Sequence, residues 1–266
     1  YYAWARRRSG ADPEHHCALN VALYSRSANR WCMTERGRRH CHRDATQLVI
    51  GPSRLQWNGS HLDIEINEVG MPIPRSVKGR IRLHPQQLFN FSTALDAHGR
   101  HRWGPLAPSA RIEVDLQSPR QRWSGHAYLD SNEGDEPIDR AFHRWDWSRS
   151  PLRDGSTAVL YDMQWPQQAD RVLSLRFDRR GGVETFTPPP RQALHNTLWG
   201  LQRQMRSPSP VRVQQQLEDT PFYQRALLSH ELLGESVQSF HETLSVPRLV
   251  SPLVQAMLPF RMPRTS

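Results

Sequence analysis

The sequence predicts an all-β fold, and three observations support this prediction. Short segments alternate apolar and polar residues, which is the pattern of half-buried strands. Turn-forming residues separate these segments at short intervals. Long helical periodicity is nearly absent, and only residues 248–258 suggest a short helix, which Pro252 interrupts. Many short strands joined by regular turns are typical of β-barrels and β-sandwiches.

Six segments have the clearest strand pattern. They are residues 18–24, 61–69, 78–84, 110–116, 157–163 and 171–177. Turns are expected at residues 51–53, 57–60, 97–100, 153–156 and 179–182. Two of these turns contain Asn58-Gly59 and Asp154-Gly155, which are pairs typical of tight hairpins.

The organisation of the chain suggests two parts. Residues 104–110 (GPLAPSA) are rich in Pro and Gly and predict a boundary, whereas residues 187–192 and 207–210 are expected to be loops. Residues 20–33 and 156–175 share a strand–turn–strand order. Two related barrels in tandem would produce this similarity, and so would any pair of hairpins.

Composition excludes several classes of protein. The chain has 266 residues, of which 37% are hydrophobic, and a mean hydropathy of −0.72. No stretch approaches the ~20 apolar residues of a membrane-spanning helix. The net charge is +9, and Lys78 is the only lysine among 35 basic residues. A Schiff-base or phosphate-loop lysine elsewhere is therefore excluded. The arginine bias fits phosphate binding, or simply the base composition of a genome.

Cysteine and histidine patterns do not predict a metal site. Cys17, Cys32 and Cys41 are an odd number without regular spacing, so no disulfide framework is expected. The clusters at residues 15–17 and 40–42 lack zinc-ligand spacing, because adjacent side chains on a strand point to opposite faces. Basic residues are dispersed along the chain, so we expect no nucleic-acid partner.

The strongest local signal is the segment of residues 122–137 (RWSGHAYLDSNEGDEP). With a period of two, one face of this strand carries Ser124, His126, Tyr128 and Asp130. On an exposed strand this face would simply meet water. Inside a cavity it would line the lumen, where burial favours the neutral carboxyl and makes Asp130 a proton donor.

Two further segments carry candidate site residues. His101 and Trp103 share a face of an extended strand, and a tryptophan ring can stabilise a developing cation. A surface histidine and a packing tryptophan are the alternative. Trp145 and Trp147 also share a face, with Asp146 on the other face. This pair suggests core packing or, alternatively, the wall of an apolar pocket.

Several long and rare stretches resemble one known family. They are residues 1–7, 16–24, 33–37, 122–137, 144–149, 217–223 and 258–264 (YYAWARR, HCALNVALY, MTERG, RWSGHAYLDSNEGDEP, RWDWSR, LEDTPFY and LPFRMPR). The chain resembles the carotenoid 1,2-hydratase family, also called hydroxyneurosporene synthase. The resemblance spans the whole chain, and the family's proteins extend further at the N-terminus.

The resemblance implies a fold of tandem lipocalin-like β-barrels. Residues 1–104 would form the C-terminal part of a first, incomplete barrel, because the chain is expected to lack about the first third of the family's length. Residues 105–262 would form the second barrel.

The resemblance also implies an activity: the family adds water across the terminal 1,2 double bond of acyclic carotenoids such as neurosporene or lycopene, without a cofactor. Its catalytic residues correspond to His101, Trp103, Tyr128 and Asp130. Asp130 would donate the proton, Trp103 and Tyr128 would stabilise the cation, and His101 would orient water or hold the protonation state of Asp130. The expected substrate-binding residues are His126, Trp145 and Trp147.

An acyclic carotenoid dissolves in lipid, so peripheral contact with the cytoplasmic side of a bacterial photosynthetic or plasma membrane is expected. Residues 4–8 and 257–264 supply arginines for anionic head groups, with Leu258 and Phe260 entering the interface. Two alternatives stay open. One is a carrier that binds carotenoids or lipids without converting them. The other is a related barrel enzyme that acts as a cyclase or isomerase.

Overall fold

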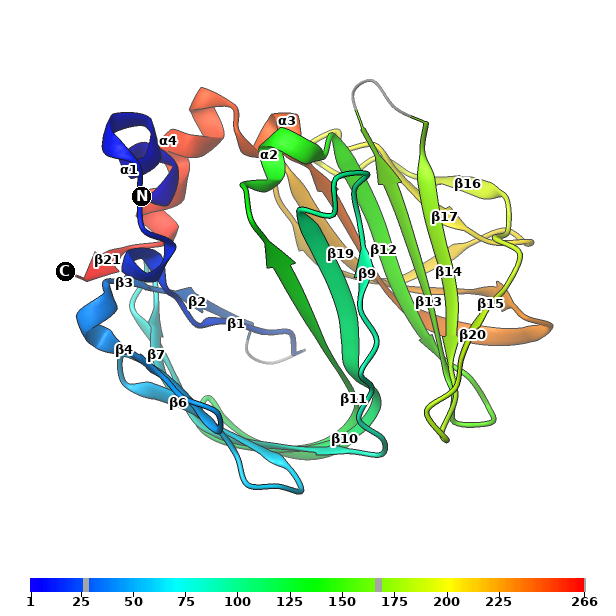
Figure 1. Ribbon diagram of the computed structural model, residues 1–266, viewed down its shortest axis with the longest axis horizontal. Helices are drawn as coiled ribbons and strands as arrows, with labels where there is room; N and C mark the ends of the chain where they lie inside the picture. Colours follow the sequence, from blue (N-terminus) through cyan, green and yellow to red (C-terminus); the bar gives the residue numbers. More distant parts are fainter. Residues whose placement is uncertain (26–28, 166–168, 266) are drawn as a thin grey trace. The chain divides into compact units, whose positions relative to one another are not determined.

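The computed structural model describes residues 1–25, 29–165 and 169–265, and antiparallel strands dominate it (Figure 1). Contacts divide the chain into two compact units that alternate along the sequence. Unit 1 comprises Tyr1–Pro85, Ala110–Ala127 and Gln255–Ser266, and unit 2 comprises Gln86–Ser109 and Tyr128–Val254. None of the helices formed by the described residues is long and apolar enough to cross a membrane.

Unit 1 is built around one antiparallel sheet with the strand order β11-β10-β8-β7-β6-β5-β4. Its strands are β4 (Cys41–Arg43), β5 (Gln47–Ile50), β6 (Ser53–Trp57), β7 (Leu62–Gly70), β8 (Arg75–Pro85), and parts of β10 (His101–Ser118) and β11 (Arg120–Gly134). A hairpin of β1 (Asn20–Leu23) and β2 (Arg30–Met33) lies outside this sheet, as does the parallel pair of β3 (Glu35–Arg36) and β21 (Arg264–Thr265). Helix α1 (Tyr2–Ser9) and short 3-10 turns at Pro13–His16 and Arg38–His40 complete the unit.

Unit 2 contains a seven-stranded antiparallel sheet with the order β15-β14-β13-β12-β20-β19-β18. The strands are β12 (Arg144–Pro151), β13 (Thr157–Gln164), β14 (Arg171–Phe177), β15 (Val183–Thr185), β18 (Arg212–Asp219), β19 (Tyr223–Leu232) and β20 (Glu235–Ser245). The short strand β9 (Thr93–Ala94) pairs with β10, and β16 (Arg191–Leu194) pairs with β17 (Arg203–Arg206). The helices are α2 (Ile138–Ala141), α3 (Val246–Leu249) and α4 (Pro252–Arg261), the last of which continues into unit 1. Among the described residues, the two edge strands of each large sheet do not pair with each other, so neither sheet closes on itself.

Alternation along the strands of unit 2 produces two different layers. One face of the sheet packs in an aromatic cluster that includes Trp103, Phe142, Trp147, Tyr161 and Phe177. The other face packs in an aliphatic cluster: Leu152, Ala158, Leu160, Leu194, Met205, Ala226, Leu228, Leu232 and Val237. Each large aromatic ring removes on the order of 150–250 Å² from water. The aromatic face therefore contributes strongly to stability, and it also surrounds the pocket described below.

All six segments with the clearest strand pattern form strands. Five of them lie within three residues of the expected bounds, and residues 110–116 belong to the longer β10. The expected helix also forms, as α3 and α4 on either side of the interruption near Pro252. Pro252 begins α4, where the missing N–H of proline breaks no helical hydrogen bond. Helix α1 was not predicted, because the apolar residues of its sequence YAWARRRS form no clear stripe.

The Pro- and Gly-rich segment 104–110 is a strand and not a linker, since it lies within β10. The pairing of β10 with β9 ends at Trp103, and its pairing with β8 begins at Ala110. Hydrogen bonding to these two strands therefore requires no N–H from Pro105 or Pro108. The chain passes from unit 2 to unit 1 between Ser109 and Ala110, at the end of this segment. The division into barrels at residues 1–104 and 105–262 stays a prediction, because the compact units interleave in sequence.

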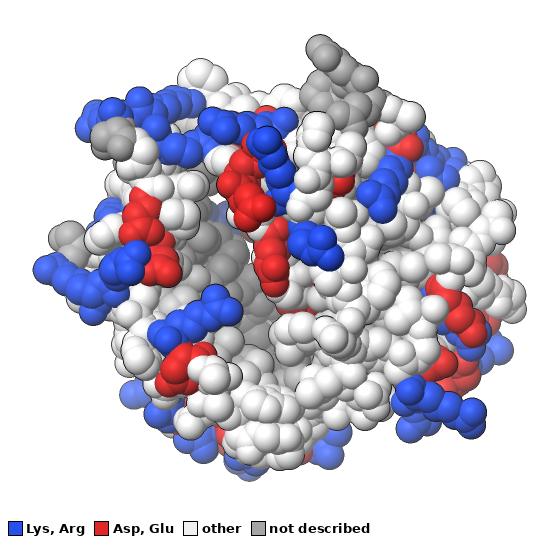
Figure 2. All heavy atoms as spheres, viewed as in Figure 1, with Lys and Arg blue, Asp and Glu red and all other residues white. Residues whose placement is uncertain are grey.

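Many of the arginine side chains form ion pairs with Asp or Glu. Lys and Arg side chains lie next to Asp and Glu over much of the face shown in Figure 2. Most of these pairs are exposed, as with Glu65, which faces Arg54 and Arg80 across unit 1's sheet. Others are buried, and in one of these Arg36 Nη2 donates to Glu68 Oε2 at 2.7 Å, while Ser53 Oγ donates to Glu68 Oε1 at 2.7 Å.

We predict that Glu68→Ala destabilises the protein by about 3–5 kcal/mol, because it leaves the buried Arg36 without its counter-charge. Glu65→Ala, which removes exposed pairs, is the control and should cost about 1 kcal/mol or less. Chemical denaturation of both variants measures the difference. Equal losses would contradict a special role for the buried pair.

Candidate active site

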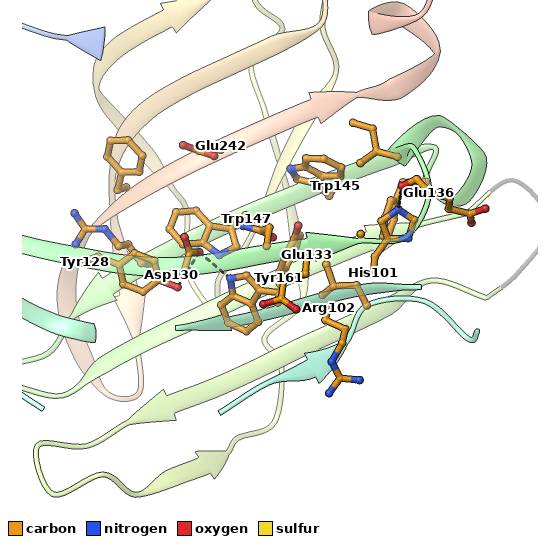
Figure 3. Close-up of a pocket in the computed structure, with 18 residues that line it drawn as sticks. His101, Arg102, Tyr128, Asp130, Glu133, Glu136, Trp145, Trp147, Tyr161 and Glu242 are labelled. Carbon is orange, nitrogen blue, oxygen red and sulfur yellow. Dashed lines mark hydrogen bonds between the residues drawn. The ribbon is translucent and has the colours of Figure 1, made fainter. Parts of the chain in front are cut away.

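A pocket of about 590 Å³ lies on the aromatic face of unit 2 (Figure 3). Strands β10, β11, β12, β13 and β20 all contribute to its walls. Its lining combines aromatic and aliphatic side chains with a similar share of polar and charged groups. The lining residues are Leu95, His101, Arg102, Trp103, Tyr128, Asp130, Asn132, Glu133, Gly134, Glu136, Ile138, Phe142, Trp145, Trp147, Arg149, Tyr161, Phe240 and Glu242. This combination is typical of a small-molecule site.

Two hydrogen bonds hold the Asp130 carboxyl in the pocket (Figure 3). Trp103 Nε1–H donates to Asp130 Oδ2 at 2.8 Å, and Tyr128 O–H donates to the same oxygen at 3.2 Å. Tyr128 and Asp130 are two residues apart on β11, so the strand places both side chains on the pocket face. Because both donors reach Oδ2, Oδ1 is the oxygen that can carry a transferable proton.

Burial raises the pKa of Asp130 above its usual value of 3.8, since the charged carboxylate loses its hydration. The hydrogen bonds from Trp103 and Tyr128 and the charge of Arg149 act in the opposite direction. These groups stabilise the carboxylate once it has formed. The environment therefore favours a neutral acid at rest and also supports its anion after proton transfer.

Trp103 is fixed by the aromatic core. Its side chain is almost fully buried, at 1% exposure. Its ring makes edge contacts with Tyr161, Phe177 and Phe91 at centroid distances of 5.7, 6.4 and 6.5 Å. These contacts orient the indole N–H toward Asp130, so the residue has both a packing and a polar function.

Tyr128 and the tryptophans of β12 form the adjoining wall. The Tyr128 ring lies 5.4 Å from the Trp147 ring. Burial raises the pKa of Tyr128 well above its usual value, and the nearby Asp130 adds to the shift, so its hydroxyl keeps its proton. Trp145 and Trp147 both line the pocket, whereas Asp146 is buried on the opposite face and bonds to Thr243. The expectation that Trp145 and Trp147 line an apolar pocket agrees with this arrangement.

His101 lies at another part of the pocket, and its ring nitrogens have their own partners. Nδ1 is 3.1 Å from Asp96 Oδ2, and Nε2 is 2.9 Å from the backbone carbonyl of Glu136. Burial by itself would raise the pKa of Asp96. Hydrogen bonds from backbone N–H groups, chiefly that of His101, outweigh this effect and hold the pKa below its usual value. His101 therefore ties the turn before β10 to the segment after β11, and neither nitrogen is directed to Asp130.

The remaining expected residues lie elsewhere. His126 is exposed and does not line the pocket. It shares the alternation of Tyr128 and Asp130, but it lies in the part of β11 that belongs to unit 1. Asp135 is also exposed and outside the pocket.

Several polar residues in the pocket escaped the sequence analysis, and two of them, Arg149 and Glu242, are charged groups on the seven-stranded sheet. Arg149 continues the alternation of Trp145 and Trp147 along β12, and Glu242 lies between Phe240 and Leu244 on β20. The period of two could have placed Arg149 on the tryptophan face. Glu242 was not identifiable, because nothing in the sequence pairs β20 with β12. Among residues 1–25, 29–165 and 169–265, no group of three or more His, Cys, Asp or Glu is arranged to hold a metal ion.

The raised pKa of Asp130 predicts a specific pH dependence of stability. The protonated form of Asp130 contributes to the free energy of unfolding. This contribution is complete below about pH 3.8 and is lost as the pH rises through the folded-state pKa. An Asn at this position does not titrate. We therefore expect the stability of Asp130→Asn relative to the parent to increase as the pH rises from about 3.8 through the folded-state pKa of Asp130. Urea denaturation across this range measures it, and a constant difference would contradict the shift.

Comparison with known proteins places the chain in a family. A family model described as carotenoid hydratase CrtC matches residues 1–266. The acyclic carotenoid 1,2-hydratase of Rubrivivax gelatinosus is 58% identical over 268 residues, with 99% of this chain and 66% of that protein covered. The protein of the same name from Thiocapsa roseopersicina is 51% identical with the same coverage, and that of Cereibacter sphaeroides is 36% identical with 94% of its length covered. The chain thus spans about two thirds of the length of the first two relatives.

A solved structure supports the fold. The crystal structure of a Nitrosomonas europaea protein described as a candidate AttH matches 82% of this chain and 76% of its own, with a TM-score of 0.58 and 11% identity. This likeness concerns the fold alone, and it confirms the predicted lipocalin-like all-β class, here with open sheets. The family model covers the whole chain and the relatives agree with it, as the sequence motifs predicted. The chain belongs to the carotenoid hydratase CrtC family.

Proposed function

We propose that the chain is a hydro-lyase that adds water to the terminal 1,2 double bond of an acyclic carotenoid, such as neurosporene or lycopene. The observation that supports it most strongly is Asp130, a carboxyl with a raised pKa held by two donors in an aromatic pocket. The family relatives named acyclic carotenoid 1,2-hydratase support the substrate class. Hydration leaves the oxidation level of substrate plus water unchanged, so the reaction requires no redox cofactor.

The first step is protonation of the double bond. Asp130 transfers its proton from Oδ1 to C2, the π bond breaks to form the C2–H bond, and C1 becomes a tertiary cation. An alkene is a weak base, so the acid must be neutral, close and poorly solvated. Trp103 N–H and Tyr128 O–H then stabilise the carboxylate that remains on Asp130.

The aromatic walls stabilise the cation. Tyr128 and Trp147 lie in contact beside Asp130, and Tyr161 lines the same pocket. The face of an aromatic ring carries negative potential and attracts a cation within about 6 Å of its centroid. Trp103 contributes through its N–H to Asp130. His101 acts as a positioning residue that fixes the segment after β11.

We expect Asp130→Asn to lower hydration by about 10²-fold or more, since it removes the general acid while keeping the size of the side chain. Asp135→Asn is the matched control, because Asp135 is exposed and outside the pocket. The assay incubates each protein with membranes that contain lycopene or neurosporene and detects a product heavier by one water. Trp103→Phe should approach the loss of Asp130→Asn, because the phenyl ring cannot donate to Oδ2. Undiminished hydration by Asp130→Asn would refute the assignment of the acid.

The apolar substrate also implies contact with a lipid surface, and we propose a peripheral attachment at the cytoplasmic side of the membrane. In unit 1, Phe260 and Met257 of α4 are 75% and 45% exposed, while Leu258 is half-buried. Trp4 of α1 is 39% exposed, and the last turn of α1 contains Arg6, Arg7 and Arg8. Exposed rings beside basic residues favour the interface of an anionic bilayer.

The double variant Met257→Ser/Phe260→Ser should bind vesicles of mixed phosphatidylglycerol and phosphatidylcholine about tenfold less tightly, because it removes apolar area that would enter the interface. Ile73→Ser is the control, since Ile73 is an exposed apolar residue outside both helices. Co-sedimentation at low and high salt measures binding. Equal binding by the double variant and the parent would exclude α4 from the contact.

A further inference from the structure

One side of the pocket carries an unpartnered donor group. The Arg149 guanidinium is half-buried and lines the pocket. Its Cζ lies 5.5 Å from the ring centroid of Tyr128 and 5.6 Å from that of Phe240. Within the part of the chain that the structure describes, no carboxylate, carbonyl or hydroxyl accepts a hydrogen bond from it. A guanidinium has five N–H donors, and a buried one ordinarily finds an acceptor.

The same side carries an unpartnered acceptor. Glu242 lies on β20 between two neighbouring strands. It is directly opposite Arg225 on β19 and directly opposite Trp147 on β12. Arg225 Nε and Nη2 both reach Glu242 Oε1 at 2.9 Å. Oε2 receives no hydrogen bond from any of the described residues. Arg225 therefore holds the carboxylate in place and leaves one of its oxygens available to the pocket.

Arg149 and Glu242 lie on the same face of the sheet, on the paired strands β12 and β20. Arg149 pairs with Phe240 and Trp147 pairs with Glu242, so the four residues alternate with period two along β12 and β20. Figure 3 shows Asp130 and Glu242 in one pocket, on β11 and β20. Both carboxylates also act on Tyr161: burial raises the pKa of its hydroxyl most, and Asp130 and Glu242 add to that shift.

We propose that Glu242 and Arg149 bind the reacting water, and that Glu242 accepts its proton. This assignment rests on the proposed hydration. Arg149 N–H donates to the water oxygen, and one water hydrogen is donated to Glu242 Oε2. When C1 becomes a cation, the water oxygen forms the C1–O bond, and the O–H bond to the hydrogen facing Glu242 breaks. Glu242 then releases this proton to solvent, and solvent reprotonates Asp130, so that one water is consumed for each alcohol formed.

In this arrangement one carboxyl donates a proton to the alkene and another accepts the proton of the water, instead of a single carboxyl performing both transfers. Asp130 is held by neutral donors and is suited to give a proton, whereas Glu242 is held by a cation and is suited to receive one. A water held by a donor and an acceptor also has a fixed orientation, which an aromatic wall alone cannot impose.

A crystal structure of the chain tests the water site directly, without any assay of activity. We expect an ordered water within about 3.2 Å of both Glu242 Oε2 and Arg149. A direct Arg149–Glu242 ion pair without such a water would overturn the proposal. The crystal structure tests the water site even if the parent chain does not hydrate carotenoids. Failure to hydrate carotenoids would contradict the proposed function and not the water site.

Isotope exchange in D₂O tests the chemical assignment. In Glu242→Gln the acid step persists, so the cation forms and returns to alkene by losing a proton. We expect hydration to fall by about 10²-fold or more while the recovered carotenoid still gains deuterium. Asp130→Asn should lose hydration and deuterium exchange together. Glu231→Gln, a carboxylate of the same hairpin that is exposed and outside the pocket, should match the parent.

Arg149 has its own pair of variants. Arg149→Met should also raise the ratio of exchange to hydration, and Arg149→Lys should recover part of the hydration because it keeps an N–H donor. Two outcomes would overturn the proposal. One is hydration at the parent's rate by Glu242→Gln. The other is a parallel loss of hydration and exchange in that variant, which would indicate that Glu242 supports the acid or the fold.

Discussion

The convergence of two neutral donors on one carboxyl oxygen of the half-buried Asp130 governs the rest of the candidate site. Trp103 and Tyr128 both donate to Asp130 Oδ2, inside a pocket that is rich in aromatic rings. Burial raises the pKa of the carboxyl and so favours its protonated form, and the donors lower the free energy of its anion. A carboxyl in water would be ionised at neutral pH, and a carboxyl in a pocket without donors would hold its proton too strongly. The balance of the two effects is what makes an acid useful toward an alkene.

The fold supplies this balance through rigid elements. Trp103 lies on β10, and Tyr128 and Asp130 lie on β11, so the three polar groups depend on neighbouring strands of one sheet. The Trp103 ring is enclosed by Tyr161 and Phe177 from the seven-stranded sheet. A shift of either strand would separate the indole N–H from Oδ2. The aromatic core of unit 2 therefore serves stability and also the geometry of the acid.

The opposite wall of the pocket has a different electrostatic character. Arg149, Arg225 and Glu242 bring full charges to the pocket side of the seven-stranded sheet, whereas the two groups that donate hydrogen bonds to Asp130 are neutral. Phe240 lies between the two guanidinium groups, with Cζ–centroid distances of 5.6 and 5.3 Å. An apolar substrate has no use for such charges along its chain, but water does. The contrast between the walls supports separate places for the proton donor and the water.

The sequence by itself determined the all-β class, the family, six strands, and the face that carries Tyr128 and Asp130, because period-two alternation and rare motifs are local properties. It also identified Trp103, Trp145 and Trp147, since each lies on a patterned strand. Only the tertiary structure decided that His126 lies outside the pocket, that both nitrogens of His101 are engaged elsewhere, and that Arg149 and Glu242 enter the site. The reason is physical: which strands become neighbours, and which donor meets which acceptor, depends on pairings between residues far apart in the chain.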